Sequence, residues 1–228
     1  QLFAGITPNQ NLTTIALSIG EPKHASPAFV KQALIDNLHH LSSYPTTKGV
    51  PALSEAIANW LQHRFGLTSI DPSSQVIPVN GTREALFSFT QALIDTSNQT
   101  TQPLVVMPNP FYQIYEGATV LAGATPYFVN CTADNGFLGD FDSIAPSVWQ
   151  QTQLLFICTP GNPTGAVIPK ATLRKLIELS DQYNFVIASD ECYSELYFDT
   201  PPVGLLQVCS EMGRNDYRNC VVFHSLSK

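Results

Sequence analysis

Short apolar runs alternate with longer amphipathic segments along most of this chain. Six of these runs hold four or five consecutive, mainly apolar residues, many of them β-branched or aromatic, which is typical of buried strands. They lie at residues 76–79, 104–107, 126–129, 154–158, 185–188 and 220–223. The segments between them repeat apolar residues with helical spacing, so the pattern predicts an α/β fold with a mainly parallel sheet and helices on both faces.

The helices predicted by this spacing have recognisable starts. Ser26 is a good N-cap and Pro27 suits the first helical position, which predicts a helix to about residue 40. Pro51 begins a second helix that ends near Gly66. Further elements are expected at about 82–93, 112–122 and 169–183 as helices, and at 14–19 as a strand.

The composition is that of a globular protein. The 228 residues include 44% hydrophobic and 13% charged side chains, which is enough for a buried core. The net charge of −7 and the lack of a basic stripe argue against a nucleic-acid partner. The sequence shows no bilayer-length apolar run and no signal-peptide layout at its start. The five cysteines form no C-x-x-C pair, so we expect reduced thiols and no metal. Because the sequence shows no signal-peptide layout and no bilayer-length apolar run, we expect a cytoplasmic protein with no membrane partner.

Ligands of open parallel sheets bind where strands end and the next helices begin. At the first such junction, Gly81 and Thr82 precede a helix whose free N–H groups and positive dipole end suit a phosphate. Ordinary helix capping by Thr82 is the structural alternative. At the second junction, the aromatic residues of Pro108–Tyr115 would either stack on a planar ring or pack in the core.

Three later junctions carry further polar groups. Asn162 lies between a glycine and a proline, in a stiff loop that would hold its amide donor in one place. Asp190 directly follows an apolar run, so its carboxylate is expected to be partly buried and to need a donor or a cation. Tyr193 would reach the same pocket. Lys228 lies just past the last run, beside two serines that suit an anion.

Each group alone fits a structural role, but together they fit one cofactor. A helix start for a phosphate, a stacking ring, an amide, a buried carboxylate, a phenol and a lysine would meet at one sheet edge. This set matches pyridoxal 5′-phosphate, whose aldehyde forms a Schiff base with a lysine, whose ring nitrogen needs an anion and whose O3′ needs donors. No G-x-G-x-x-G motif follows the first run and no P-loop is present in the sequence, which disfavours a dinucleotide.

The order and spacing of three motifs resemble the fold-type I, class I/II pyridoxal-phosphate aminotransferases. The motifs are Asn162-Pro163-Thr164-Gly165, Asp190-x-x-Tyr193 and Ser225-x-Ser227-Lys228, and the resemblance covers nearly the whole chain. Within this group the chain is most similar to bacterial succinyldiaminopimelate transaminases, through the stretches 17–24, 78–87 and 109–118. The resemblance implies a transaminase of lysine and diaminopimelate biosynthesis, with N-succinyl-LL-2,6-diaminopimelate as amino donor and 2-oxoglutarate as acceptor.

The resemblance assigns roles to the residues around the cofactor ring. Lys228 would bind the cofactor covalently and shuttle a proton, and Asp190 would keep the ring nitrogen protonated. Asn162 and Tyr193 would donate to O3′, with Tyr193 counted among the catalytic groups and Asn162 also in contact with the substrate. Tyr112 would stack on the ring face.

The remaining implied roles concern the phosphate and the substrate carboxylate. Gly81, Thr82 and Ser225 would hold the phosphate. Tyr44 would reach the phosphate of a neighbouring subunit, because sites of this family form across a homodimer interface. Gly20 would approach the substrate carboxylate through its backbone. The partners implied are therefore a second copy of the chain and small amino and 2-oxo acids.

The resemblance also implies a domain division. Residues 1–43 would contribute to a small domain that is only partly present, and 44–228 would form the first part of the large cofactor-binding domain. The sequence begins without methionine and only five residues follow its last apolar run, so we expect the front part of a longer protein. Two family arginines, one for the phosphate and one for the substrate carboxylate, would lie outside this sequence.

Other functions on the same scaffold stay open. The same cofactor shell serves aspartate and aromatic aminotransferases and carbon–sulfur lyases, and part of the substrate choice would lie outside this sequence. A ligand-sensing domain of a transcription regulator is the non-enzymatic alternative, and the acidic net charge argues against it. An α/β domain without a cofactor is disfavoured because six suitable groups converge at one edge.

Overall fold

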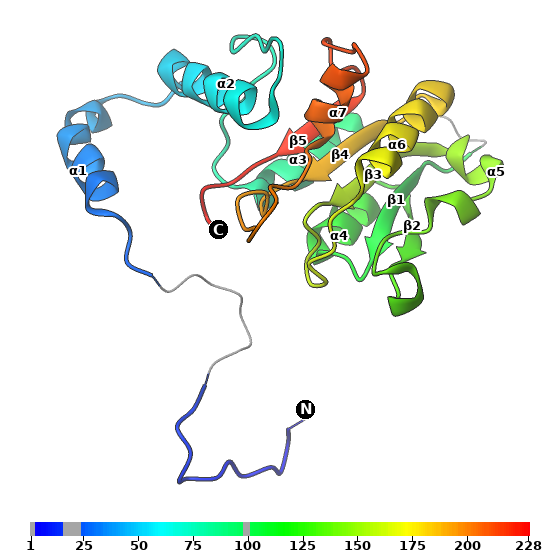
Figure 1. Cartoon of the computed structure of the whole chain (residues 1–228), viewed down its shortest axis with the longest axis horizontal. Helices are drawn as coiled ribbons and strands as arrows, with labels where there is room; N and C mark the ends of the chain where they lie inside the picture. The colour runs from blue at the N-terminus through cyan, green and yellow to red at the C-terminus, as the bar shows by residue number, and fades with distance from the viewer. Residues whose placement is uncertain (1–2, 16–23, 98–100) are drawn as a thin grey trace. The chain divides into compact units, whose positions relative to one another are not determined.

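The computed structural model describes residues 3–15, 24–97 and 101–228. The chain falls into two compact units, 1–43 and 44–228 (Figure 1). Within the described part of the chain, no helix is both long and apolar enough to cross a membrane. The assignment of the two units to a small and a large domain of a longer protein stays a prediction.

The first unit contains helix α1 (Ala28–Asp36) and the 3₁₀ helix η1 (Leu38–Ser42). α1 begins directly after Pro27, close to the predicted start, and the expected single helix is divided at Asn37. Neither helix has a buried side chain. The strand predicted at 14–19 falls mostly outside the described residues.

The second unit is built on a five-stranded sheet in the order β2-β1-β3-β4-β5 (Figure 1). Every neighbouring pair of strands is parallel. The central strand, β3, has four consecutive buried residues, as expected for a strand covered on both faces. The predicted α/β fold with a parallel sheet is therefore confirmed. The strands are β1 (Leu104–Asn109), β2 (Thr125–Asn130), β3 (Thr152–Cys158), β4 (Val186–Asp190) and β5 (Cys220–Phe223).

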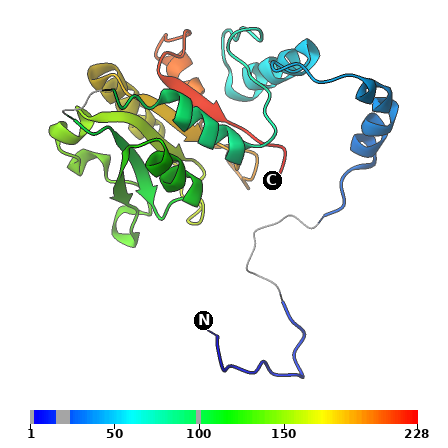
Figure 2. The ribbon, with the colours of Figure 1, turned by 180° about the vertical axis from the view of Figure 1, so that it is seen from behind.

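Helices cover both faces of the sheet, as the views from the front and from behind show (Figures 1 and 2). Alternate residues of β3 point to opposite faces, so Leu154 and Phe156 join one core and Leu155 and Ile157 the other. The first core includes residues of α3 (Thr82–Leu93) and α4 (Gln113–Leu121). The second includes residues of α2 (Pro51–Phe65), α5 (Pro146–Trp149), α6 (Lys170–Tyr183) and α7 (Leu205–Glu211). Two short 3₁₀ turns, η2 (Ala133–Asn135) and η3 (Phe141–Ser143), lie between β2 and β3.

Two predictions about the elements are wrong. Residues 76–79 form no strand, and Ile77 is 73% exposed. Pro78 has no backbone N–H to donate to a neighbouring strand, which makes this run a poor sheet member in spite of its apolar side chains. The pattern also misses α7, whose seven residues are too few to show a clear helical period.

Candidate active site

The carboxyl ends of β4 and β5 bring the two predicted charged residues to one edge of the sheet. Asp190 is the last residue of β4, and its Cα is in register with that of Phe223, the last residue of β5. Lys228 follows Phe223 by five residues. The carboxylate therefore ends one strand and the amine lies in the segment that follows its parallel neighbour, at the edge where α/β sheets bind their ligands.

The Asp190 carboxylate is buried and held by two donors. Its Oδ2 accepts a hydrogen bond of 2.8 Å from the Tyr115 hydroxyl, and its Oδ1 accepts one of 3.3 Å from the backbone N–H of Cys192. Among the described residues, no lysine or arginine forms an ion pair with it. A buried carboxylate without a cation is costly, so Asp190 suits a positively charged group of a ligand. The expectation that a distant donor meets this carboxylate is confirmed.

Tyr115 is a site residue that the sequence pattern did not single out. Its ring stacks on Phe156 at 4.5 Å between ring centroids and meets the edge of Tyr112 at 5.8 Å. Burial, followed by the nearby Asp190 carboxylate, raises the pKa of the Tyr115 hydroxyl well above its usual value, so the hydroxyl stays a donor at neutral pH. The available signal was its spacing of three residues from Tyr112, which brings both rings to one side of α4.

Replacing Tyr115 with phenylalanine is expected to lower kcat about tenfold or more, because a hydrogen bond to a charged group contributes about 1.5–3 kcal/mol. The ring stack on Phe156 would remain, so the fold is expected to survive. Steady-state kinetics and cofactor titration measure the effect. Tyr217→Phe is the matched control, since it removes another largely buried hydroxyl that donates to the Ser69 carbonyl. If both variants lower kcat equally, the contact with Asp190 has no special role.

Asn162, Tyr193 and Lys228 also come together. The Asn162 side-chain amide donates to the Tyr193 hydroxyl at 3.1 Å, and donation by both groups to the cofactor O3′ stays a prediction. The Lys228 Nζ lies 5.7 Å from the centroid of the Tyr193 ring. Burial is the main cause that raises the pKa of the Tyr193 hydroxyl, which therefore remains a donor at neutral pH.

Gly81 and Thr82, which were predicted to hold a phosphate, lie at the start of α3. Gly81 is the N-cap residue, with a φ of 124° that glycine adopts far more readily than other residues. Thr82 is therefore the first helical residue and not the cap, so the alternative that it is an ordinary helix cap is wrong. The Thr82 hydroxyl instead accepts a contact of 3.4 Å from the Cys192 thiol, which ties the helix start to the loop after Asp190. Phosphate binding here stays a prediction.

The other predicted site residues have mixed positions. Ser225 bonds its hydroxyl to that of Ser227 at 2.6 Å, in the segment that leads to Lys228. Tyr112 is half-buried at the start of α4. Tyr44 is fully exposed, and its contact with a second subunit stays a prediction. Gly20 lies outside the described residues.

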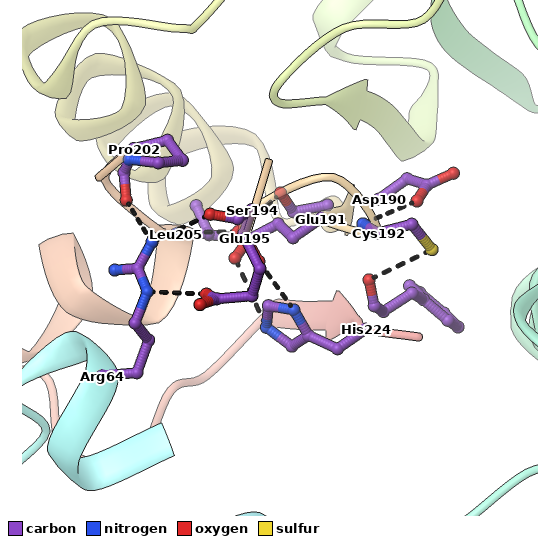
Figure 3. Close-up of polar contacts among 11 residues, drawn as sticks. Arg64, Asp190, Glu191, Cys192, Ser194, Glu195, Pro202, Leu205 and His224 are labelled. Carbon is purple, nitrogen blue, oxygen red and sulfur yellow. Dashed lines mark hydrogen bonds and ion pairs between the residues drawn. The ribbon is translucent and has the colours of Figure 1, made fainter. Parts of the chain in front are cut away.

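Behind the site, two further titratable side chains are buried together (Figure 3). Glu191 accepts hydrogen bonds of 2.8 Å from the Ser189 hydroxyl and from the backbone N–H of Leu205. Its Oε2 lies 3.5 Å from Nε2 of His224. Burial raises the pKa of Glu191 to about 7 and lowers that of His224 to about 4, so between these values both groups are neutral and the contact is not an ion pair. The sequence pattern identified neither residue as functional.

These opposite pKa shifts predict opposite effects of pH on the free energy of unfolding. The ordinary pKa values are 4.5 for Glu191 and 6.5 for His224. Glu191 binds its proton more tightly in the folded protein, so its contribution falls as pH rises through this range. His224 binds its proton less tightly when folded, so its contribution rises.

Between about pH 4.5 and 6.5, the stability of Glu191→Gln relative to the unsubstituted protein is expected to increase with pH, by up to about 1.4 kcal/mol per unit. Over the same range, the stability of His224→Phe relative to the unsubstituted protein is expected to decrease with pH. Denaturant unfolding at several pH values measures both slopes, and slopes of the same sign would contradict the assignment.

The residues at this edge fit pyridoxal 5′-phosphate. Asp190 is a buried carboxylate that lacks a cationic partner among the described residues, which suits a protonated ring nitrogen. Tyr193 and Asn162 present a phenol and an amide beside Lys228. Gly81 caps the start of α3, where free backbone N–H groups suit an anion, and a Cβ atom there would lie 2.7 Å from the Glu84 carboxylate. No cluster of three or more His, Cys, Asp or Glu side chains suited to a metal occurs in the described parts of the chain.

Comparison with known proteins decides the family. Residues 13–228 match the family model described as "Aminotransferase class I and II". The chain belongs to this family. Its members depend on pyridoxal 5′-phosphate, so the cofactor inferred from the site is confirmed at the level of the family.

Relatives of this aminotransferase chain are found among curated proteins and solved structures. The LL-diaminopimelate aminotransferase of Nitratidesulfovibrio vulgaris strain DP4 is 33% identical over 238 residues, which cover 100% of this chain and 58% of that protein. An aminotransferase structure from Neisseria meningitidis has 44% identity and a TM-score of 0.92, and the match covers 99% of this chain and 56% of that one. The aminotransferase AspB of Helicobacter pylori has 34% identity and a TM-score of 0.85, and the match covers 92% of this chain and 54% of that one. The chain thus spans little more than half the length of these relatives.

Proposed function

We propose that the protein containing this aminotransferase chain is a pyridoxal 5′-phosphate-dependent transaminase. The observation that carries the proposal is the arrangement at the ends of the adjacent parallel strands β4 and β5, where the buried Asp190 carboxylate ends β4 and Lys228 lies in the segment that follows β5. Tyr193, held by Asn162, lies beside Lys228. A carboxylate, a phenol, an amide and an amine in this arrangement match the polar atoms of the cofactor ring.

Each side chain has a distinct part in the proposed reaction. When bound, the cofactor supplies an electron sink that makes the Cα proton of an amino acid acidic. Lys228 would hold the cofactor covalently and, once released by the amino acid, would accept the Cα proton at Nζ. Asp190 would keep a proton on the ring nitrogen, with Tyr115 fixing the carboxylate. Asn162 and Tyr193 would donate hydrogen bonds to the ring oxygen.

For the substrates, we propose N-succinyl-LL-2,6-diaminopimelate as the amino donor and 2-oxoglutarate as the acceptor. The resemblance of stretches 17–24, 78–87 and 109–118 to succinyldiaminopimelate transaminases supports this choice. The names of the curated relatives favour a second candidate, LL-diaminopimelate without the succinyl group. Both candidates place the protein in diaminopimelate and lysine biosynthesis. We also propose that the protein is a cytoplasmic homodimer, in which Tyr44 reaches the cofactor phosphate of the neighbouring subunit.

A panel of amino donors separates these possibilities. The intact protein, loaded with pyridoxal 5′-phosphate, is supplied with 2-oxoglutarate and one donor at a time, and glutamate formation is measured. The donors are the succinylated and free diaminopimelates, aspartate and phenylalanine. The proposal predicts the highest kcat/KM for the succinylated donor. A preference for aspartate or phenylalanine would contradict the substrate assignment, and release of pyruvate from cystathionine without glutamate would indicate a lyase.

A further inference from the structure

The contact between Glu191 and His224 lies directly beyond the last paired residues of β4 and β5. The strand register ends with Asp190 opposite Phe223, and the backbone N–H of Glu191 donates to the Phe223 carbonyl at 2.9 Å. Glu191 and His224 are the next residues of the two strands, and their side chains approach to 3.5 Å. The side chains thus continue the link between the strands at the position where strand pairing stops.

The same two strand ends carry the charged groups of the proposed active site. Asp190 immediately precedes Glu191, and Lys228 follows His224 by four residues. Successive strand residues point to opposite faces, and accordingly Asp190 bonds to Tyr115 of α4 whereas Glu191 bonds to the start of α7. Glu191 and His224 therefore lie on the side of the sheet away from the Asp190 carboxylate, so any effect they have on it passes through the backbone.

Both side chains are fixed by their surroundings. A Cβ atom at Gly204 would lie 2.9 Å from the Glu191 Oε2, so only glycine leaves room for the carboxyl group. The His224 ring packs edge-on against Trp60, with 4.9 Å between ring centroids, and lies 5.5 Å from Phe65. Its Nδ1 is 3.5 Å from the Ser194 hydroxyl. The start of the segment that carries Lys228 is thus held by Glu191 just past β4, by the aromatic rings of α2 and by Ser194 in the loop after β4.

The buried ring nitrogen of His224 depends on Glu191 for a hydrogen-bond partner. Nε2 of His224 is buried and has no hydrogen-bond partner among the described residues, although the Glu191 carboxyl oxygen is near. The nearest cation, Arg64, bonds instead to Glu195 and to the carbonyls of Ser194 and Pro202 (Figure 3). At 3.5 Å a single proton can link the two groups, carried either by the carboxyl oxygen or by Nε2. This explains why a glutamic acid can be buried here without a cationic partner.

We propose that Glu191 and His224 form a positioning pair, which shares one proton and fixes the start of the Ser225–Lys228 segment relative to Asp190. The inference rests on the proposed function, because it assumes that Lys228 binds the cofactor. Neither residue touches the cofactor. The pair sets the distance between the amine and the carboxylate through the ends of β5 and β4.

The test uses His224→Phe, Glu191→Gln and the control Asp199→Asn in the intact protein with pyridoxal 5′-phosphate bound. His224→Phe keeps an aromatic ring against Trp60 but removes both nitrogens. A small displacement of a catalytic group can cost about a hundredfold in rate, so kcat is expected to fall tenfold to about a hundredfold, with KM little changed. The pH midpoint of the absorbance change of the bound cofactor is expected to shift. Glu191→Gln can still donate to Nε2 through its amide, so it should retain most of kcat. Asp199→Asn, an exposed change in the loop after β4, should leave all readouts unchanged.

Two results would overturn the positioning pair. One is a His224→Phe protein with a lowered Tm but an unchanged absorbance midpoint and kcat, which would make the contact purely structural. The other is equal loss of kcat in Glu191→Gln and His224→Phe. If His224→Phe does not fold, Glu191→Leu removes the same contact from the other side and is judged by the same criteria. Borohydride treatment of the unsubstituted protein separates the two proposals, because failure to fix cofactor on Lys228 would contradict the proposed function itself.

Discussion

Replacing Lys228 with alanine is expected to reduce transamination about ten-thousand-fold, the upper range for loss of a positioned proton-transfer group. The variant would also lose the covalent link to pyridoxal 5′-phosphate, so borohydride would no longer fix the cofactor on the protein. The expected cause is local, because the Lys228 side chain is exposed and its truncation leaves no cavity in the core. Stopped-flow absorbance of single half-reactions with each substrate measures the loss directly.

Lys228→Arg is the informative companion to this variant. Arginine keeps the positive charge but stays protonated, so it can neither bind the cofactor aldehyde nor accept the Cα proton. The account predicts that arginine is as inactive as alanine. Near-normal half-reactions in Lys228→Arg would show that the residue contributes only charge. Lys175→Ala, which removes a surface lysine paired with Asp142, controls for a general loss of positive charge.

Replacing Asp190 with asparagine is expected to lower kcat about a thousandfold, because removing one partner of a buried charged pair costs about 3–5 kcal/mol. The amide has the shape of the carboxylate and can still accept from the Tyr115 hydroxyl, so folding should be preserved. It cannot balance a positive charge on the cofactor ring nitrogen. The measurement is kcat at saturating substrate, together with Tm and the far-UV circular dichroism spectrum.

Asp190→Ala and Asp199→Asn complete the series. Alanine removes the side chain altogether and should reduce kcat at least as far as asparagine. Asp199 is an exposed aspartate in the loop after β4, and its change to asparagine should leave kcat unchanged. Normal turnover in both Asp190 variants would move the role of partner to the ring nitrogen to another residue.

The sequence predicted those parts of the fold that depend on local apolar pattern. Each strand of the sheet follows from a run such as Leu154–Cys158, which is buried because helices cover both faces. The run at 76–79 has a similar composition, but its backbone contains Pro78, and Ile77 and Val79 are exposed while Val76 packs on the core. Burial depends on which segments meet in three dimensions, and a short run of residues carries little information about that.

The sequence likewise predicted only those parts of the candidate site that depend on chain order. Asp190, Asn162, Tyr193 and Lys228 follow strands, so their shared edge could be inferred from the chain order. The partner of Asp190 could not, because it depends on which helix packs beside β4 and on how Tyr115 is turned toward it. Glu191 and His224 were missed for a related reason, since their contact arises only when β4 and β5 are adjacent and in register.

We propose that the edge formed by β4 and β5 binds pyridoxal 5′-phosphate through Lys228. Its most direct test is to incubate the intact protein with the cofactor, reduce it with borohydride, digest it and locate the pyridoxyl group by mass spectrometry. The account predicts one modified site, Lys228, among the six lysines of this sequence. Stoichiometric modification of any other lysine, with Lys228 unmodified, would contradict it.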